Sequence, residues 1–563
     1  MLSTINKIEN SLQGQPASSG ILSTIPRSDV PTLPDLDEKS LGCACGDGIL
    51  KWKYVEAKLE ENRWKNLHAR AVQRAMEAHE RIAELEAKLR LREMQLFGKK
   101  SEKTAQSEKG ESERQTPPKK RGHQRGQKGH GRKLNSDLPI KEELIDLHES
   151  QCYCQMCGNP YEEFPSTEDS ELLEIEVRAH KRIIKRKRYL SSCNCPKTPG
   201  IITAPPVGRL IPGGKIGVSI WVKILLDKFE YYRPTCRLLK SLKNLGLDVP
   251  QGTATDGLKK IKSLFKPLYD SIAEYNRNEN LWNADETRWE VFAEKEGKAG
   301  HRWYLWVFAA VKSVVFFIDP SRSKTVPQNH LGNSKGTLIV DRYKAYFILL
   351  ENGQIILIFC WAHVRRDFLT HARKYPKEEN WAIEWVKEIR NLYYINAQRV
   401  VARITKDDEI FKKNQTQLEE TIKHIQEKSR IQQEDPAISK TAKKILKSLD
   451  NHWHGLTPFI HDSNIPMDNN RGERILRGPV VGRKGFYGSG SIWSALLAAM
   501  IFSVLQTIKL WNINPQTWMT LFLQACADNN GKLPNNWQRF LPWNMSQAQL
   551  KLFSKPLTYS DTS

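Results

Sequence analysis

The sequence lacks the features of a secreted or membrane-spanning chain. The first twenty residues contain no sustained apolar stretch of the kind a signal peptide needs, so we expect a reducing, cytoplasmic location. The most apolar run, residues 492–508, is short for a bilayer span, which takes about 20 apolar residues, and it includes polar side chains. We therefore predict a buried core helix over this run and no membrane partner.

An acidic surplus is also absent. The 563 residues include 87 Lys and Arg against 64 Asp and Glu, a formal net charge of +23. Such a balance favours a polyanionic partner, and we expect nucleic acid, the alternative being a soluble protein that is merely basic. A chain of this length is expected to fold as several domains rather than around one core.

Proline and glycine are missing from residues 51–97, which predicts one long helix after a disordered leader at residues 1–50. Ala75, Ile82 and Leu89 recur every seven residues, as in a coiled-coil seam. Arg92 occupies one core position of that seam and weakens it. Two interpretations stay open: self-association as a coiled coil, and a single amphipathic helix packed on its own chain.

Residues 98–135 form a basic, glycine-rich linker. Glycine interleaved with cations predicts an extended arm that tracks a phosphate backbone, although a solvated linker has the same composition. The candidate DNA-contacting cations of this arm are Lys119, Lys120, Arg121, Arg125, Lys128, Arg132 and Lys133.

Five of the 10 cysteines cluster within residues 136–205, which we assign to a small zinc-binding domain. Cys154 and Cys157 form a C-x-x-C knuckle, and Cys193 with Cys195 supplies a second thiol pair for a structural Zn²⁺. Cys152 is the expected outsider, and His180 could replace one thiol. The alternative is a set of reduced cysteines without metal.

The remaining two-thirds of the chain predicts helices, then a mixed sheet, then helices. Residues 206–278 are expected to be helical and DNA-binding, with a turn at Gly246 that suits a helix-turn-helix or any other helical hairpin. Closely spaced strands followed by alternating strands and helices predict an α/β catalytic domain at 279–515. A helical insertion is expected at about 375–455, and a C-terminal helix and tail at 516–563.

Three acidic residues stand where the chain would not place a charge without a partner. Asp285 lies within a predicted strand, and Asp341 ends the apolar strand GTLIV. Two such carboxylates repel each other unless a divalent cation lies between them. Glu473 follows Asn469 and Asn470, which can cap a helical turn, and precedes Pro479, which is expected to end that turn. Hard oxygen ligands suit Mg²⁺ or Mn²⁺, two ions per site, for phosphodiester chemistry.

Cations surround the third acid in the sequence, as a phosphate-binding site requires. The block CWAHVRRDF adds His363, whose role we leave between touching the scissile phosphate and holding the helix of the second acid. Asp319 is expected to be a cap, and Glu286 to point to the opposite face of its strand from Asp285. The candidate residues for DNA binding or site support are His363, Arg366, Asn469, Arg474, Arg477, Arg483 and Lys484.

Several strings resemble, in order, the transposases of the insertion sequence 66 family: LFGKKSEK, RGHQRGQKGH, NADETRW, VDRYKAYF, CWAHVRRDF and MDNNRGERILR. The resemblance implies a ribonuclease H-like domain with a DDE triad, in which Asp285, Asp341 and Glu473 match the three acids. It also implies a zinc-binding domain and two small accessory proteins. The expected partners are the element's terminal repeats, target DNA and a second copy of the chain.

The expected reaction is metal-dependent strand cleavage and strand transfer during transposition. A DNA-binding protein of the same fold that does not cut, and a nuclease or resolvase that cuts without joining, are the competing hypotheses. The presence of all three acids weighs against the first of these. The long basic N-terminal half favours end recognition over simple cutting.

Overall fold

The structure, a computed structural model, describes residues 47–97, scattered residues between 142 and 192, and residues 201–556 except 295, 297–299 and 352. The chain divides into two compact units, residues 1–92 and 93–563. Residues 1–46 of the predicted leader and the basic linker at 98–135 lie outside the described residues, and residues 47–50, predicted as the end of the leader, belong instead to a helix.

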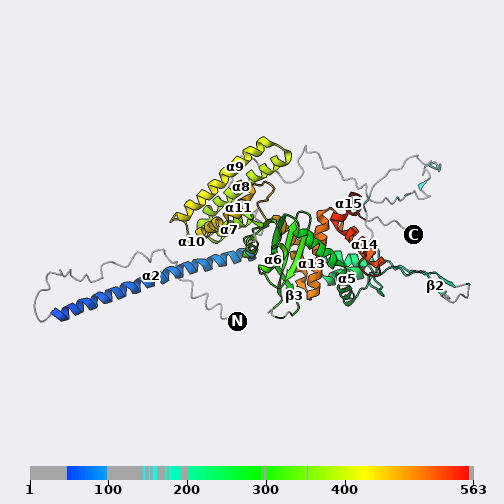
Figure 1. The fold of residues 1–563 in the computed structure, drawn as a ribbon, viewed down its shortest axis with the longest axis horizontal. Helices are drawn as coiled ribbons and strands as arrows, with labels where there is room; N and C mark the ends of the chain where they lie inside the picture. The colour runs from blue at the N-terminus through cyan, green and yellow to red at the C-terminus, as the bar shows by residue number, and fades with distance from the viewer. Residues whose placement is uncertain are drawn as a thin grey trace. The chain divides into compact units, whose positions relative to one another are not determined.

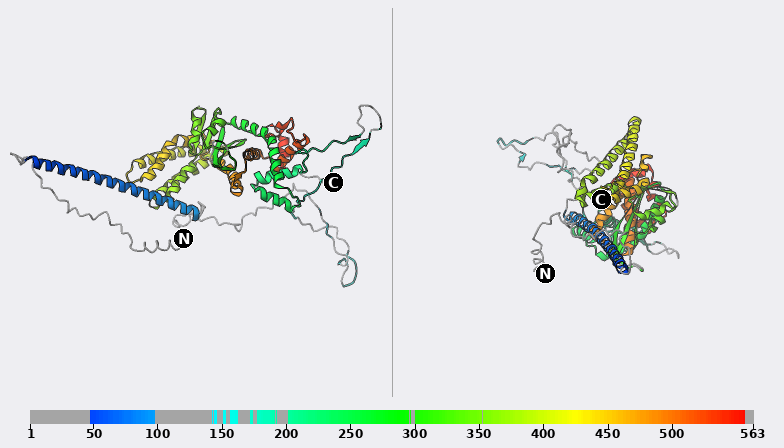
Figure 2. Two further views of the ribbon diagram at one scale, coloured as in Figure 1. Left: turned by 90° about the horizontal axis from the view of Figure 1, so that it is seen from below. Right: turned by 90° about the vertical axis from the view of Figure 1, so that its left-hand side faces the viewer.

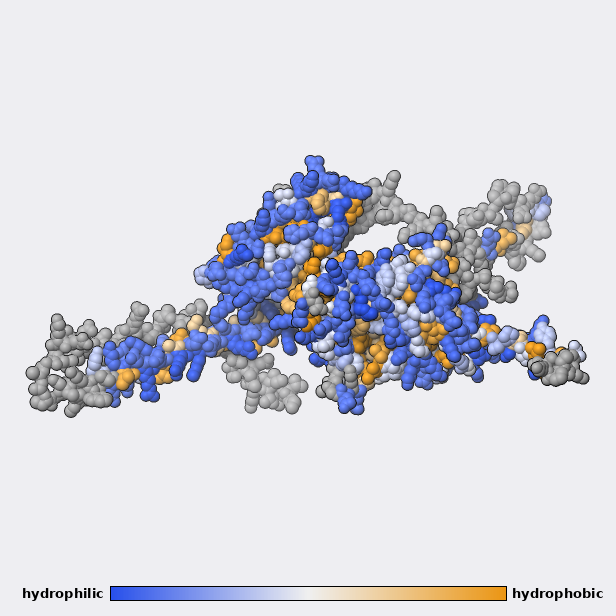
Figure 3. All heavy atoms as spheres, in the orientation of Figure 1, coloured by the Kyte–Doolittle hydropathy of each residue, from blue (hydrophilic) through white to orange (hydrophobic). Residues whose placement is uncertain are grey.

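The described part of the first unit is residues 47–92 of helix α2 (Asp47–Phe97), which ends where the composition predicts. Ion pairs one turn apart, such as Glu61 with Lys65, support it along its length. The seam residues Ile82 and Leu89 are 52% and 60% exposed. Apolar side chains are interspersed with hydrophilic ones along this helix (Figure 3).

A mixed sheet forms the centre of the second unit, with strand order β5-β4-β3-β6-β7 and β8 paired to β3. Strands β3, β4 and β5 pair in antiparallel fashion, and β6, β7 and β8 run parallel to their neighbours. The mixed α/β prediction is therefore confirmed. The strands are β3 (Leu281–Val291), β4 (Arg302–Ala310), β5 (Val314–Asp319), β6 (Gly336–Val340), β7 (Ile355–Phe359) and β8 (Gly488–Ser489).

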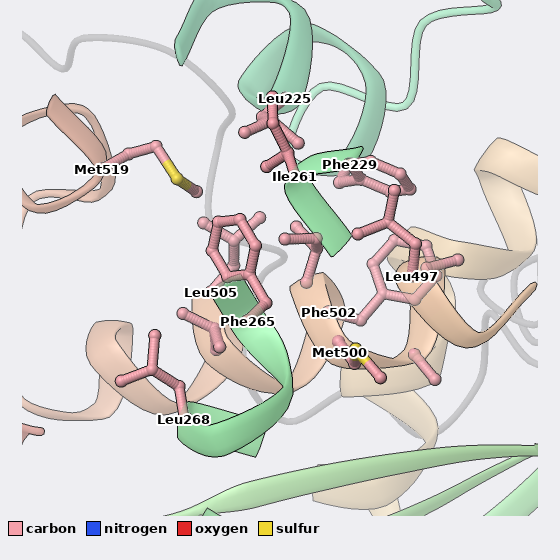
Figure 4. Packing of buried hydrophobic residues seen from close by; sticks show 14 of the residues in the cluster. Leu225, Phe229, Ile261, Phe265, Leu268, Leu497, Met500, Phe502, Leu505 and Met519 are labelled. Atoms are coloured by element: carbon pink, nitrogen blue, oxygen red, sulfur yellow. The ribbon is translucent and has the colours of Figure 1, made fainter. Parts of the chain in front are cut away.

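Helices cover one face of β3, β4 and β5 and form a core with it (Figure 4). In that core Phe265 of α5 lies against Leu505 of α13, beside Met519 of α14. These helices are α3 (Val218–Phe229), α4 (Thr235–Asn244), α5 (Gln251–Arg277), α13 (Ile492–Leu510), α14 (Pro515–Asp528), η6 (Trp537–Phe540), η7 (Pro542–Asn544) and α15 (Gln547–Ser554).

Helix α13 is long and apolar enough to cross a bilayer by length and composition, but two-thirds of it is buried inside the fold. Two of its hydroxyl groups form hydrogen bonds with the backbone of the edge strand β5. Thr507 Oγ1 accepts from Val314 N at 3.0 Å, and Ser503 Oγ accepts from Phe316 N at 2.9 Å. The predicted core helix is therefore confirmed, and its polar residues serve the edge of the sheet.

The opposite face of the sheet packs against a second group of helices around a separate core. The helices of the predicted insertion, α8 to α11, lie together on one side of the sheet (Figures 1 and 2). The group comprises α6 (Thr325–Leu331), η3 (Lys344–Leu350), α7 (Trp361–Lys374), η4 (Pro376–Glu378), α8 (Glu379–Thr405), α9 (Asp408–Glu434), α10 (Lys440–Asn451), α11 (Trp453–Leu456) and η5 (Pro458–Ile460).

Helices α4 and α5 form the expected hairpin, and Gly246 at its turn has a φ of +83°. Gly257 of α5 is needed for close packing, because an added Cβ would come within 1.9 Å of the Trp221 ring. Upstream, β1 (Arg188–Leu190) and β2 (Ile201–Thr203) pair as an antiparallel ribbon whose strands are fully exposed (Figure 1).

Candidate active site

Two of the predicted acids stand level with each other at the centre of the sheet. The parallel register pairs Asn283 of β3 with Ile339 of β6, which puts Asp285 level with Asp341 just past the end of β6, and the Asp341 carboxylate acts on the pKa of Asp285. Asp341 Oδ1 accepts from Tyr343 N at 2.9 Å, which fixes the turn after β6. Asp285 Oδ1 accepts from Glu286 N at 2.8 Å.

Helix α12 (Asn470–Phe486) carries the third acid and is fastened to β3 at both ends. At its start, Asn469 Nδ2 donates to Ala284 O at 2.6 Å and Asn469 Oδ1 accepts from Asn283 Nδ2 at 2.9 Å. Beyond its end, β8 pairs with the end of β3. The helix therefore runs alongside β3, and its first turn brings Glu473 towards Asp285.

Two local expectations about this helix are wrong. Pro479 does not end it, because α12 continues to Phe486 with Pro479 buried inside it. Close packing holds the helix through the proline: an added Cβ at Gly478 would lie 2.0 Å from Tyr232 Oη. Asn469 occupies the N-cap position, but its side chain makes no capping bond because the sheet engages it.

Asp285 is a buried carboxyl group close to three other carboxylates, an environment in which a bound cation would stabilise its charged form. Burial first, and the carboxylates of Glu286, Asp341 and Glu473 after it, together raise the pKa of Asp285 to about 8. Glu286 points to the other face, as predicted, where Arg322 Nη2 lies 2.5 Å from its Oε1 and Tyr346 donates to its Oε2 at 2.5 Å. Among the described ion pairs, Asp285 has no comparable partner.

The third acid is contacted by two residues of α7. His363 Nε2 lies 3.7 Å from Glu473 Oε1, and Arg366 Nη2 lies 3.7 Å from Glu473 Oε2. Burial, with the charge of Arg366 second, lowers the pKa of His363. These two residues therefore meet the third acid rather than the second, which was not among the roles considered for His363. Asp319 caps a turn as expected, accepting from Ser321 N at 2.7 Å.

The comparison with known families decides the relationship of this chain. The sequence model described as the Transposase IS66 family matches residues 213–496, half of the chain, and spans all three acids. The chain belongs to this family.

Two similar proteins come from Sinorhizobium fredii (strain NBRC 101917 / NGR234). "Uncharacterized protein y4jD" is 26% identical over 74% of this chain and 82% of its own length. "Uncharacterized protein y4hP" is 24% identical over 70% of this chain and 74% of its own length.

The cations predicted near the third acid of this IS66 family member divide into two groups. Arg474, Arg477 and Lys484 are exposed on α12 and available to a phosphate backbone. Arg483 is half-buried, and its Nη1 donates to Thr287 Oγ1 at 3.1 Å and to Arg288 O, so it ties α12 to β3. The seven linker cations at 119–133 lie outside the described residues.

Most of the zinc ligands predicted for this family member lie outside the residues that the structure describes. Cys154, Cys193 and Cys195 lie outside the described residues, while Cys157 and His180 are described and exposed. Cys152 O accepts from Tyr161 N at 2.8 Å, a backbone bond that closes the loop around the C-x-x-C knuckle. The zinc assignment stays a prediction.

A basic ribbon precedes the helical part of the second unit and was not predicted from the sequence. Residues 177–190, VRAHKRIIKRKRYL, are all exposed, contain no acid, and continue into β1. Ala204 N donates to Lys187 O at 2.9 Å, and Arg186 Nε donates to Ala204 O at 2.6 Å, so the two arms are held together. Because side chains alternate along extended backbone, both faces of this ribbon carry cations. The density of Lys and Arg was the available signal.

Cys360, which was not predicted as a site residue, is fully buried at the start of α7, three residues before His363. Its Sγ, a ring nitrogen of His363 and a carboxylate oxygen of Glu473 all lie within 4.8 Å of one another. Among the described residues this is the one group of three such donors that meets that distance, so the oxygens of Asp285, Asp341 and Glu473 are spread more widely.

Proposed function

We propose that this IS66 family member is a DDE transposase that binds the ends of its element, cleaves them and joins them to target DNA. The observation that carries the proposal is the convergence of three acids. Asp285 of β3 is level with Asp341, which follows the neighbouring parallel strand β6, and α12, fastened to β3, carries Glu473 close enough to act on the pKa of Asp285. The strand order, three antiparallel strands followed by parallel ones, supports a ribonuclease H-like domain.

The donor set suits Mg²⁺ or Mn²⁺, because it consists of carboxylate oxygens. A spread wider than 4.8 Å suits two ions, which lie about 3.5–4 Å apart in such sites. When bound, the ions would supply an activated water or 3′-hydroxyl and stabilise the leaving oxygen. Asp285, Asp341 and Glu473 would hold them, and Asp285 would lose its proton on binding because a cation offsets its neighbours.

The chain's other residues would orient the acids and hold the DNA. His363 and Arg366 fix the direction of the Glu473 carboxylate. Arg474, Arg477 and Lys484 would bind phosphates beside the acids, and the basic ribbon would bind DNA away from them. Structural zinc at the cysteine cluster, pairing of two chains through α2, and two accessory proteins complete the proposal.

The test is cleavage and strand transfer of labelled element-end DNA in Mg²⁺ or Mn²⁺. The wild type is compared with Glu473→Gln and with Glu420→Gln, whose side chain is exposed on α9. We expect metal-dependent products from the wild type and Glu420→Gln, and loss of products with intact end binding in Glu473→Gln. Products that persist in Glu473→Gln would contradict the assignment of the third acid.

The two competing functions predict different results in the same assay. A binding protein that does not cut would retain DNA and yield no products from any variant, also after the accessory proteins are added. A nuclease or resolvase would yield cleaved ends with no joined product. Asp285→Asn, compared under the same conditions, separates binding from cutting, because it removes a carboxylate and leaves the exposed cations in place.

A further inference from the structure

A second set of metal-binding donors lies next to the three acids and has a different chemistry. Cys360 Sγ, a His363 ring nitrogen and a Glu473 oxygen lie within 4.8 Å of one another. His363 Nε2 and Glu473 Oε1 are already 3.7 Å apart. A tetrahedral zinc ion with ligands at about 2.0–2.3 Å places its donors roughly 3.3–3.7 Å from one another. The donor atoms are therefore close to that geometry, and side-chain rotations that bring them about an ångström closer together would reach it.

The local sequence explains why these donors converge. Cys360 is the N-cap residue of α7 and His363 lies in its first turn, so C-x-x-H spacing directs both side chains to the same end of the helix. The start of α12 is tied to that end: Asn469 N donates to Cys360 Sγ at 3.2 Å, and Trp361 N donates to Met467 O at 2.9 Å. The first turn of α12 then brings Glu473 to His363.

The sulfur atom has surroundings that suit a coordinated thiolate. The Cys360 sulfur already accepts a backbone hydrogen bond, because Asn469 N donates to Cys360 Sγ at 3.2 Å. Donors that already point at a sulfur stabilise its negative charge once a metal displaces the proton. Cys526 is equally buried, and no such group of donors is described around it.

Two atoms of the group are left without a hydrogen bond. His363 Nδ1 and Glu473 Oε1 are both buried and, in the described part of the chain, neither has a hydrogen-bond partner. Buried polar atoms are nearly always satisfied, so an orphaned pair in one small cluster needs an explanation. A metal ion bound by Cys360, Glu473 and one ring nitrogen of His363 would satisfy the carboxylate oxygen, and it would satisfy Nδ1 as well when that nitrogen is the ligand.

We infer that Cys360, His363 and Glu473 form a zinc site that shares Glu473 with the site of the three acids. One sulfur, one nitrogen and one oxygen donor suit Zn²⁺ better than Mg²⁺, which prefers oxygen alone. Three protein ligands leave the fourth tetrahedral position for a water molecule. This site is separate from the cysteine cluster near residues 152–195, which lies on another part of the chain.

The shared ligand gives the site a consequence that rests on the proposed function. A carboxylate turned towards Cys360 and His363 is not available to the pair of ions held by Asp285 and Asp341. Zn²⁺ and Mg²⁺ then compete for one side chain, and the zinc-loaded protein is an inactive form. The supply of zinc relative to magnesium would set the fraction of chains able to cut.

The test counts metal ions on the full-length protein. The wild type, Cys360→Ser, His363→Gln and the control Cys526→Ser are loaded with Zn²⁺, freed of excess, and measured by elemental analysis, with folding checked by circular dichroism. We expect Cys360→Ser and His363→Gln each to hold one zinc equivalent fewer than the wild type, and Cys526→Ser to match it. The cysteine cluster near residues 152–195 is present in all four proteins, so any zinc that it binds contributes equally to all four counts.

Cobalt substitution gives a second readout of the same site. We expect the Co²⁺–thiolate absorption of the wild type to lose one component in Cys360→Ser and to keep it in Cys526→Ser. Equal zinc counts and equal cobalt spectra in folded Cys360→Ser and wild type would overturn the zinc site.

Competition tests the shared ligand without any DNA. Added Mg²⁺ should weaken zinc binding at this site in the wild type and have no such effect in Asp341→Asn, where the site for oxygen-bound ions is broken. If the wild type holds the extra zinc equivalent but Mg²⁺ does not weaken its binding, the zinc site is supported and the Mg²⁺ site of the proposed function is contradicted. Failure of the zinc site and failure of the proposed function therefore give different results.

Discussion

Asn469 joins the start of α12 to the central strand through its side-chain amide, which is 1% exposed. Asn469→Ala would leave the Asn283 amide and the Ala284 carbonyl buried without partners, and each such group costs about 1–3 kcal/mol. We expect the free energy of unfolding to fall by about 2–4 kcal/mol in urea titrations. Asn414→Ala, on the exposed side of α9, should change it by less than about 0.5 kcal/mol. Equal losses in both variants would contradict this role.

Asp285 gives the metal-free protein a distinct pH dependence. Its pKa is about 8 in the fold, against an ordinary value of 3.8, because of burial first and neighbouring carboxylates second. Its contribution to stability is therefore full below pH 3.8 and is lost as the pH rises towards 8. For this group alone the loss is about 1.4 kcal/mol per pH unit.

Asp285→Asn should flatten that dependence in chelator-treated protein, and Mg²⁺ should flatten it in the wild type by offsetting the charge. The measurement is chemical denaturation at several pH values between 5 and 8, on both proteins, with and without Mg²⁺. Parallel profiles for the two metal-free proteins would show that Asp285 ionises in the fold as readily as in the unfolded chain.

At the scale of elements, α13 protects the outer edge of the sheet. Thr507 Oγ1 accepts from Val314 N at 3.0 Å and donates to Val314 O at 3.2 Å. Thr507→Val keeps the volume and removes both bonds, so we expect a loss of about 1–3 kcal/mol in unfolding free energy and a greater tendency to aggregate. Thr520→Val is the matched control, because its hydroxyl bonds only to Gln516 O within α14.

The basic ribbon makes its own prediction. Replacing Arg182 and Lys185 by Ala should weaken binding to duplex DNA at every sequence and lower the slope of log affinity against log salt by about 1 per lost phosphate contact. The control removes two exposed cations from α9, Lys412 and Lys423. An unchanged salt slope in the ribbon variant would remove the ribbon from the DNA interface.

The sequence predicted what local pattern determines. The succession of strands along the chain, the core helix α13, the opposite direction of Glu286 and the hairpin at Gly246 all follow from periodicity and turn residues, whereas the order of strands within the sheet was not predicted. It could not predict that α12 runs through Pro479, because packing against Tyr232 outweighs the local preference. Nor could it bring Cys360 to Glu473, since that meeting depends on bonds between the starts of two helices distant in sequence.

At the scale of the whole molecule, α2 leaves its apolar seam open to a second copy. Ile82→Asp with Leu89→Asp would place charges in that seam, and we expect the mass measured by analytical ultracentrifugation to fall from dimer to monomer. Gln73→Asp lies on the opposite side of the heptad and should leave the mass unchanged. A wild type that is monomeric at all concentrations would favour the other interpretation, a helix packed on its own chain.

Because α12 is fastened to β3 across a long stretch of sequence, the residues of the candidate site leave the ribosome at very different times during synthesis. Asn283 and Asn469 are 186 residues apart, and Trp289 and Ser489 are 200 apart. A ribosome therefore releases the basic ribbon, the central strand and the first two acids long before it reaches the third. A growing or truncated chain lacks the last carboxylate, so under the proposed function we expect a chain that stops before α12 to cut no DNA.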